Sequence, residues 1–171
     1  AINNAEKFIY IENQFFVGGS HHWLPPVSKA ETQAAPNTVP LMLVDRIVTK
    51  IKNKELFKVY IILPQMPDGR PDGIGTQGVL YYQFKTIEMM YYRLNKAIKE
   101  LGIEDKCVED YIQFMCLGKV EWNEVKQRNE RFMIYVHSKL MIVDDTYLIV
   151  GSANLNSRSL DGRRDSEICI G

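Results

Sequence analysis

Two short apolar runs near the carboxyl end of the chain constrain its fold more than any other feature. They occupy residues 139–143 and 146–150 and are separated by Asp144 and Asp145. Both runs are rich in β-branched and other apolar side chains, which at this length favours strands over helices. A pair of aspartates between two such runs is typical of a tight turn. This segment is therefore predicted to form two strands joined by a tight turn.

The rest of the chain alternates between strand-like and helix-like patterns before it reaches these runs. Thr38 and Pro40 precede one helical pattern. A second helical pattern, residues 80–101, ends at Gly102, which is expected to cap it. Apolar residues recur along it at spacings of three and four, so they are predicted to lie in the core, Phe84 among them. The expected strands are residues 8–11, 58–63, 111–117, 131–137, 139–143, 146–150 and 168–170.

This order of elements predicts the α/β class. Strands alternate with helices early in the chain and follow one another late, which indicates an α/β/α sandwich with a central mixed β-sheet flanked by helices. The polar residues 121–130 are expected to form an excursion between two of the late strands.

The size and composition of the chain limit its function classes. Its 171 residues are enough for one domain with a sizeable core, and no apolar run approaches the length of a membrane span. The formal net charge is zero, which argues against a broad nucleic-acid surface because such a surface needs clustered Lys and Arg. Cys107, Cys116 and Cys169 are odd in number and lack metal-ligand spacing, so we expect reduced thiols packed in or beside the core of a cytosolic protein.

Polar side chains at the ends of the two late strands form a pattern suited to phosphate chemistry. His137 and Lys139 are two residues apart, so in a strand they point to the same face while Ser138 points the other way. Ser152 and Asn154 follow the next strand with the same spacing. An imidazole and a fixed positive charge that face hydroxyl and amide donors could act on a phosphoester and hold its oxygens.

Asp144 is predicted to be structural rather than catalytic. It lies seven residues after His137, an odd number, so a regular strand would direct it to the opposite face. Its position at the expected turn favours a role in the turn itself or in an ion pair. Asp144 is therefore not one of the candidate catalytic residues.

Several motifs together resemble the phospholipase D superfamily. The chain has H-x-K at residues 137–139, followed by four residues and an Asp, and then G-S-x-N at residues 151–154. The segments IYIENQFF, residues 9–16, and RDSE, residues 164–167, are similar to those of the eukaryotic phospholipase D enzymes. The middle of the chain resembles the plant-type enzymes more than the animal ones. The resemblance spans nearly the whole chain and implies one domain, residues 1–171, that is the C-terminal catalytic lobe of a larger protein.

The resemblance implies an activity on lipids. Phosphatidylcholine-like phospholipids would be hydrolysed to phosphatidate and a free headgroup, with transphosphatidylation, through a phosphohistidine intermediate. Lys139, Ser152 and Asn154 would hold the phosphate oxygens. The mechanism implied requires no metal in this segment, although calcium could act through an N-terminal domain outside it.

A carboxylate is expected to support the catalytic histidine. Such a histidine needs a carboxylate on its second nitrogen to fix its tautomer. The family pattern favours Glu167 for this role and leaves Asp165 as the second choice. Whether His137 is the nucleophile or the general acid stays open, although the family favours an acid–base role.

The chain supplies one H-x-K motif, whereas the implied mechanism uses two histidines. His21 and His22 have no Lys at the right spacing. The second motif is expected from an N-terminal half of the same enzyme or from a second copy of the chain, so the segment alone is expected to be inactive. A cytoplasmic protein, peripheral at phospholipid membranes and without a nucleic-acid partner, is the main expectation. A nucleic-acid phosphodiesterase of the same superfamily and an inactive lipid-binding scaffold are the alternatives.

Overall fold

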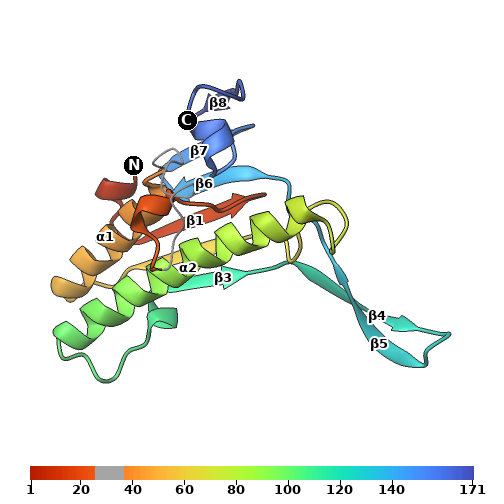
Figure 1. The fold of residues 1–171 in the computed structure, drawn as a ribbon. Helices are drawn as coiled ribbons and strands as arrows, with labels where there is room; N and C mark the ends of the chain where they lie inside the picture. The colour runs from red at the N-terminus through yellow and green to blue at the C-terminus, as the bar shows by residue number, and fades with distance from the viewer. Residues whose placement is uncertain (26–36) are drawn as a thin grey trace.

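The computed structural model describes residues 1–25 and 37–171, and its centre is a six-stranded sheet (Figure 1). The strands are β1 (Phe8–Asn13), β2 (Lys58–Ile62), β3 (Ile112–Met115), β6 (Lys139–Val143), β7 (Tyr147–Gly151) and β8 (Cys169–Ile170). Their order in the sheet is β3-β2-β1-β6-β7-β8. β1, β2 and β3 are parallel, whereas β6, β7 and β8 each pair antiparallel with a neighbour. The sheet is therefore mixed, as predicted.

Two long helices, α1 (Val39–Lys52) and α2 (Ile74–Glu100), link the parallel strands and cover one face of the sheet (Figure 1). Parallel neighbours need such crossover connections. Alternate residues of β1, Ile9 and Ile11 among them, form one core with apolar residues of both helices. The predicted α/β class, with a central mixed sheet and flanking helices, is confirmed. The short helices are η1 (Ile2–Asn4), η2 (Ser20–His22), η4 (Val108–Asp110) and α3 (Ser157–Leu160).

α2 begins earlier than predicted, and part of its apolar face is exposed. It starts at Ile74 rather than near residue 80, and it ends before Gly102, as predicted. The φ of Gly102 is 64°, which suits a glycine cap. With 27 residues the helix is about 40 Å long, roughly twice the length of a six-residue strand. The sheet therefore covers only part of it, and Phe84, which was predicted to be in the core, is 61% exposed.

β4 (Gly118–Asn123) and β5 (Arg128–Met133) form a separate two-stranded hairpin that projects away from the sheet (Figure 1). The expected excursion over residues 121–130 is thus present, but it consists of paired strands. The predicted strand over residues 131–137 is wrong in its second half, because β5 ends at Met133. The N–H of Ile134 bonds to the carbonyl of Leu117 at 3.1 Å and closes the hairpin, and residues 134–138 then lead to β6 outside any strand.

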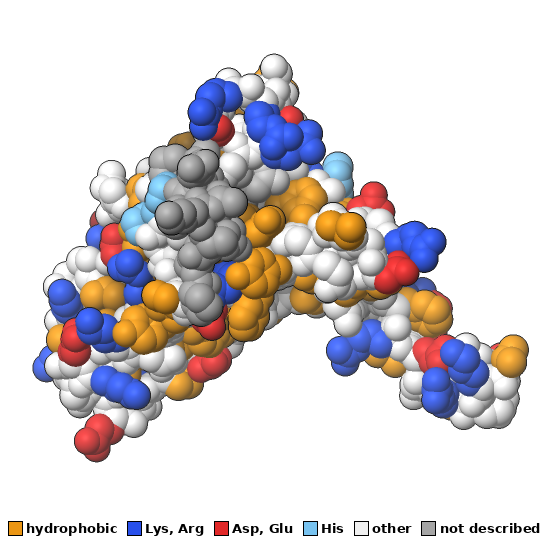
Figure 2. Space-filling model, viewed as in Figure 1, with side chains coloured by type: hydrophobic (Ala, Val, Ile, Leu, Met, Phe, Trp, Pro, Cys, Tyr) orange, Lys and Arg blue, Asp and Glu red, His pale blue; other side chains and the backbone are white. Residues whose placement is uncertain are grey.

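All three cysteines lie on the molecular surface, which also has charged side chains of both signs. Cys107, Cys116 and Cys169 are free and exposed, so the prediction that they pack in or beside the core is wrong. The first two lie in loops, and Cys169 is in the short edge strand β8, where no further strand covers it. On the face drawn in Figure 2, Lys and Arg side chains are interspersed with Asp and Glu.

The turn between β6 and β7 has the predicted tight geometry. Asp144 and Asp145 both have a positive φ, 52° and 57°. The N–H of Thr146 donates to the carbonyl of Val143 at 3.1 Å. Positive φ at both central residues is characteristic of the type I′ turn, and Asp tolerates this conformation better than most residues do.

The carboxylate of Asp144 joins this turn to the beginning of β1. It accepts hydrogen bonds from the backbone N–H groups of Glu6, Lys7 and Phe8, at 2.6, 2.7 and 2.8 Å. Burial favours the neutral form of Asp144, but the three N–H groups favour the anion and the net effect lowers its pKa. Asp144 therefore has the structural position that was expected of it, with backbone N–H groups in place of a cation as partners.

Replacing Asp144 with Ala is expected to lower the free energy of unfolding by about 2–4 kcal/mol more than Asp145→Ala does, because only the former removes three hydrogen bonds to an anion. Asp145→Ala controls for the loss of a residue that tolerates positive φ. Because folding lowers the pKa of Asp144, this difference should be complete above about pH 4 and shrink as the pH falls through the folded-state pKa. Urea unfolding of both variants at several pH values measures it, and equal losses would contradict the assigned role.

Candidate active site

The segment that leads into β6 directs alternate side chains toward one place. The rings of Tyr135 and His137 stack with their centroids 6.3 Å apart, and Nζ of Lys139 contacts the carbonyl oxygen of His137. Ser138, between them, instead donates a hydrogen bond to Glu12. The Lys139 ammonium therefore contacts the backbone of His137 whereas Ser138 turns to Glu12, and His137 precedes the strand rather than lying in it.

Gln14, directly after β1, connects the polar groups of this site. Its Oε1 accepts hydrogen bonds from Nζ of Lys139 at 3.1 Å and from Nδ2 of Asn154 at 3.3 Å. Its Nε2 donates to the hydroxyl of Tyr135 at 2.9 Å. The β1–β6 register brings these groups together, because Asn13 lies opposite Lys139. From the sequence, Gln14 belongs to the family segment IYIENQFF and its role stays open between a polar strand end and a substrate contact, because its partners can be identified only from that register.

This set of hydrogen bonds fixes the orientation of Asn154. The Lys139 ammonium can only donate, so Gln14 must face it with the amide oxygen. The Asn154 amide also faces that oxygen, so Asn154 must face it with its NH₂ group. Oδ1 of Asn154 is then buried without a hydrogen-bond partner among the described residues. An unpaired buried acceptor is costly. It marks a position at which a bound molecule, or another part of the protein, could donate a hydrogen bond.

Ser152 and Glu167 meet where β7 ends and β8 begins. Oγ of Ser152 donates to Oε2 of Glu167 and accepts from the N–H of Ile168 at 3.0 Å. Gly151 permits this close approach, since a Cβ at this position would lie only 2.3 Å from the carbonyl oxygen of Ile168. Oε1 of Glu167 accepts from Oγ of Ser159 at 2.6 Å. The two serine hydroxyls therefore hold both oxygens of this carboxylate.

The charges of Glu167 and Lys139 influence each other. Hydrogen bonds from Ser152 and Ser159 lower the pKa of Glu167. Burial lowers the pKa of Lys139, and the negative charge of Glu167 partly opposes that effect. Ser159 is a residue that sequence reasoning missed. It lies in α3, whose N-cap residue Asn156 accepts the N–H of Ser159 at 3.1 Å, and the sequence signal for this was only a short cap motif.

Asp165 is placed differently from Glu167. Its two oxygens pair with Arg158, at 3.1 Å from Nε and 3.0 Å from Nη2. Among the residues that the structure describes, neither carboxylate hydrogen-bonds to His137, whose side chain is exposed. The structure thus brings Glu167 to the donors of the site and Asp165 to Arg158, and the carboxylate that supports His137 stays a prediction.

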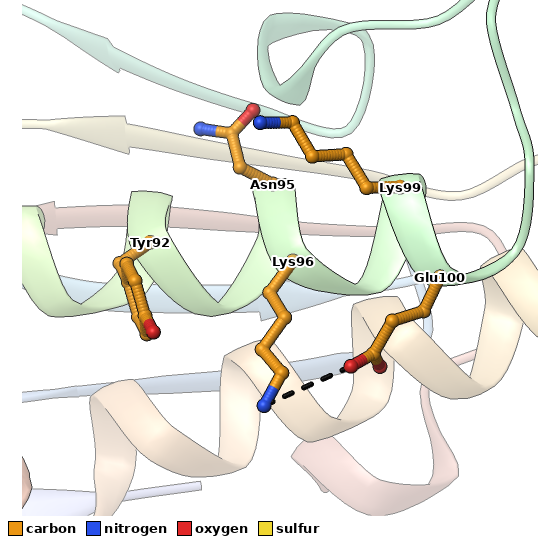
Figure 3. A pocket seen from close by; sticks show the side chains of 5 residues that line it. All are labelled: Tyr92, Asn95, Lys96, Lys99 and Glu100. Carbon is orange, nitrogen blue, oxygen red and sulfur yellow. Dashed lines mark ion pairs between the residues drawn. The ribbon is translucent and has the colours of Figure 1, made fainter.

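The rest of the described chain offers no competing centre. A shallow pocket on α2 is lined by Tyr92, Asn95, Lys96, Lys99 and Glu100 (Figure 3). All five lie on one helix, and Lys96 pairs with Glu100 at 3.7 Å, so groups from different elements do not converge there. Residues 1–25 and 37–171 contain no group of His, Cys, Asp and Glu that could hold a metal ion. Over the same ranges, every helix is too short or too polar to span a bilayer.

Comparison with known proteins gives consistent matches. The family model "Phospholipase D" matches residues 1–171. Phospholipase D alpha 2 of Arabidopsis thaliana is 45% identical over 191 aligned residues, which cover 100% of this chain and 23% of that protein. Phospholipase D beta 2 of the same plant is 43% identical over 190 residues, covering 100% and 20%. Among solved structures, NucT from Helicobacter pylori has a TM-score of 0.44 at 11% identity, covering 98% of this chain and 69% of that one.

The family model and the plant relatives agree with the motifs of the sequence. The predicted resemblance to plant-type enzymes is confirmed, because the relatives are phospholipases D of plants. The chain spans about a fifth to a quarter of the length of these curated relatives. The family model matches every residue, and the plant relatives are more than 40% identical along the whole chain. This protein therefore belongs to the phospholipase D family.

Proposed function

We propose that this chain is the C-terminal catalytic lobe of a phospholipase D that hydrolyses phosphatidylcholine-like phospholipids. The observation that carries the proposal is the convergence of Lys139 and Asn154 on one acceptor oxygen, with His137 adjoining Lys139. A phosphate oxygen could replace that amide oxygen, because it accepts the same hydrogen bonds from an ammonium and an amide NH₂ group. The names of the plant relatives support a phospholipid substrate.

The proposed reaction has two steps at the phosphorus atom. One histidine nitrogen attacks phosphorus, and the bond to the headgroup oxygen breaks while a second histidine protonates the leaving alcohol. Water then attacks the phosphorus of the phosphohistidine and gives its proton to the second histidine. The bond between phosphorus and the first histidine breaks, and phosphatidate is released. An alcohol in place of water gives transphosphatidylation. His137 supplies one of the two histidines, and family resemblance favours the acid–base role for it.

The remaining residues of the site stabilise charge. Lys139, Ser152 and Asn154 would hold the phosphoryl oxygens. To do so, Ser152 would give up its hydrogen bond to Glu167 and donate one to the phosphate instead. We assign Glu167 rather than Asp165 to the second nitrogen of His137, because Asp165 is held by Arg158 whereas the charge of Glu167 already acts on Lys139.

The second histidine, the membrane and any cofactor lie outside this chain. We infer that an N-terminal half of the same enzyme, or a second copy of the chain, supplies the other H-x-K motif. We expect a cytoplasmic enzyme that is peripheral at phospholipid membranes and has no nucleic-acid partner. The proposed chemistry takes no metal from these residues, and calcium would act through another domain.

Replacing His137 with Asn in the full-length protein is expected to reduce phosphatidate formation by about a thousandfold or more, because one of two essential proton-transfer groups is lost. His21→Asn, at an exposed histidine in η2, is the control and should keep full activity. Turnover is measured on phosphatidylcholine and on DNA in parallel. Unchanged turnover in His137→Asn would exclude His137 from the mechanism, and turnover of DNA alone would exclude the lipid substrate.

Replacing Gln14 with Leu is expected to lower kcat by about tenfold to a hundredfold, since Lys139 and Asn154 lose the acceptor that orients both. Gln113→Leu is the matched control, because Gln113 is also half-buried but lies in β3, outside the site. Steady-state kinetics separate kcat from KM. Equal small effects of the two substitutions would show that Gln14 does not position the donors.

Replacing Ser159 with Ala is expected to shift the acidic limb of the pH–rate profile to higher pH. The hydroxyl of Ser159 stabilises the charged form of Glu167, so its removal raises the pKa of Glu167 and protonates this carboxylate at a higher pH. Ser166→Ala, at an exposed serine nearby, should leave the profile in place. A uniform loss of rate without a shift of the limb would indicate a purely structural role for Ser159.

A further inference from the structure

The β4–β5 hairpin is an arm that has no packing partner in the described part of the chain. β4 and β5 pair only with each other, and the arm projects away from the sheet and both long helices (Figure 1). Hydrophobic and charged side chains lie together at its far end (Figure 2). An isolated two-stranded hairpin is marginally stable in water. A surface that receives the arm would therefore also stabilise it.

The register divides the arm into two chemically different faces. Val120 lies opposite Arg131, and Trp122 opposite Asn129, so these side chains share one face, which has no acidic residue. The other face contains Glu121 opposite Glu130.

The acidic face is neutralised within the arm. Glu121 pairs with Lys119. Glu130 pairs with Lys126 at 2.8 Å and with Arg128 at 3.0 Å. Arg131 on the opposite face has no ion pair of this kind among the described residues. The arm therefore has one face on which ion pairs surround Phe132, and one face with apolar side chains and a guanidinium outside any ion pair among the described residues.

We propose that the face formed by Val120, Trp122 and Arg131 lies flat on a phospholipid surface, with Val125 of the connecting turn dipping into it. Trp122 is 51% exposed and Val125 is 94% exposed, which is unfavourable in water. An indole prefers the boundary between acyl chains and headgroups, and a guanidinium binds phosphate from there. A lipid–water interface offers both environments at once.

The position of the arm relative to the site favours lipid over another partner. Residues 134–136 are all that separates β5 from His137, and the bond from Ile134 to Leu117 closes the base of the arm. An arm that lies flat at headgroup level would therefore bring His137 to the level of the phosphodiester. This inference rests on the proposed function for the identity of the surface, but the binding itself does not require turnover.

The test is binding of the full-length protein to sedimenting vesicles of phosphatidylcholine with phosphatidate as a minor component. The His137→Asn background prevents turnover, so a failure of the proposed enzymatic function does not affect the result. Trp122→Ala and Val125→Asp are expected to lower the vesicle-bound fraction about tenfold, because buried apolar area determines interfacial affinity. Tyr92→Ala and Leu56→Asp are matched controls, since Tyr92 is 52% and Leu56 is 95% exposed on other elements.

Two further measurements make the outcome decisive. The thermal midpoint of each variant, measured without vesicles, must equal that of the parent protein, so that unfolding does not mimic a loss of binding. Brominated phosphatidylcholine should quench a component of the tryptophan emission that is missing in Trp122→Ala. Equal vesicle binding by arm and control variants would overturn the proposal. Absence of quenching from Trp122 would also overturn it, and would assign the arm to a contact within the full-length protein.

Discussion

The antiparallel pairing of β1 with β6 is the interaction on which the rest of the structure depends. It joins the beginning of the chain to the carboxyl-terminal hairpin and makes the sheet mixed. At one end of the pair the Asp144 carboxylate holds three N–H groups, and at the other end Asn13 lies opposite Lys139. Because strand side chains alternate, a slip of one residue would direct Lys139 to the opposite face. The hydrogen bonds of Asp144 therefore help to fix the β1–β6 register that positions Lys139 at the other end of β6.

The site forms where three strand ends meet. Gln14 follows β1, Lys139 begins β6 and Asn154 follows β7, so a single acceptor can orient donors from two other strands. Asn13 strengthens the junction, because its buried side chain accepts the N–H of Leu155 at 3.1 Å. Preorganised donors are effective in catalysis because they need not reorient when charge develops on the substrate. The packed sheet can provide that rigidity, and none of the candidate residues His137, Lys139, Ser152 and Asn154 belongs to the core.

Local patterns predicted much of this arrangement, and tertiary register accounts for what they missed. The bounds of β6 and the turn at Asp144 follow from patterns over a few residues. The partners of Gln14 and the role of Ser159 could not be found in that way, because they depend on strand pairing and on α3. Phe84 was misplaced for a related reason: helical spacing identifies an apolar face but does not reveal where the sheet beneath it ends.

In the proposed function, the geometry of phosphoryl transfer would require groups on both sides of the substrate. The attacking and leaving groups lie roughly in line on opposite sides of phosphorus. One end of one sheet presents its groups from a single side, and here Lys139 and Asn154 meet at Gln14 while Ser152 binds Glu167. An exposed imidazole, and an Oδ1 of Asn154 that has no partner among the described residues, are then the features expected of a half-site, whose opposite side another lobe would supply under the proposed function. Under the proposed function, a substrate held between two lobes at a membrane would also have to keep its phosphate at a fixed height. An arm joined to His137 through residues 134–136 is suited to set that height.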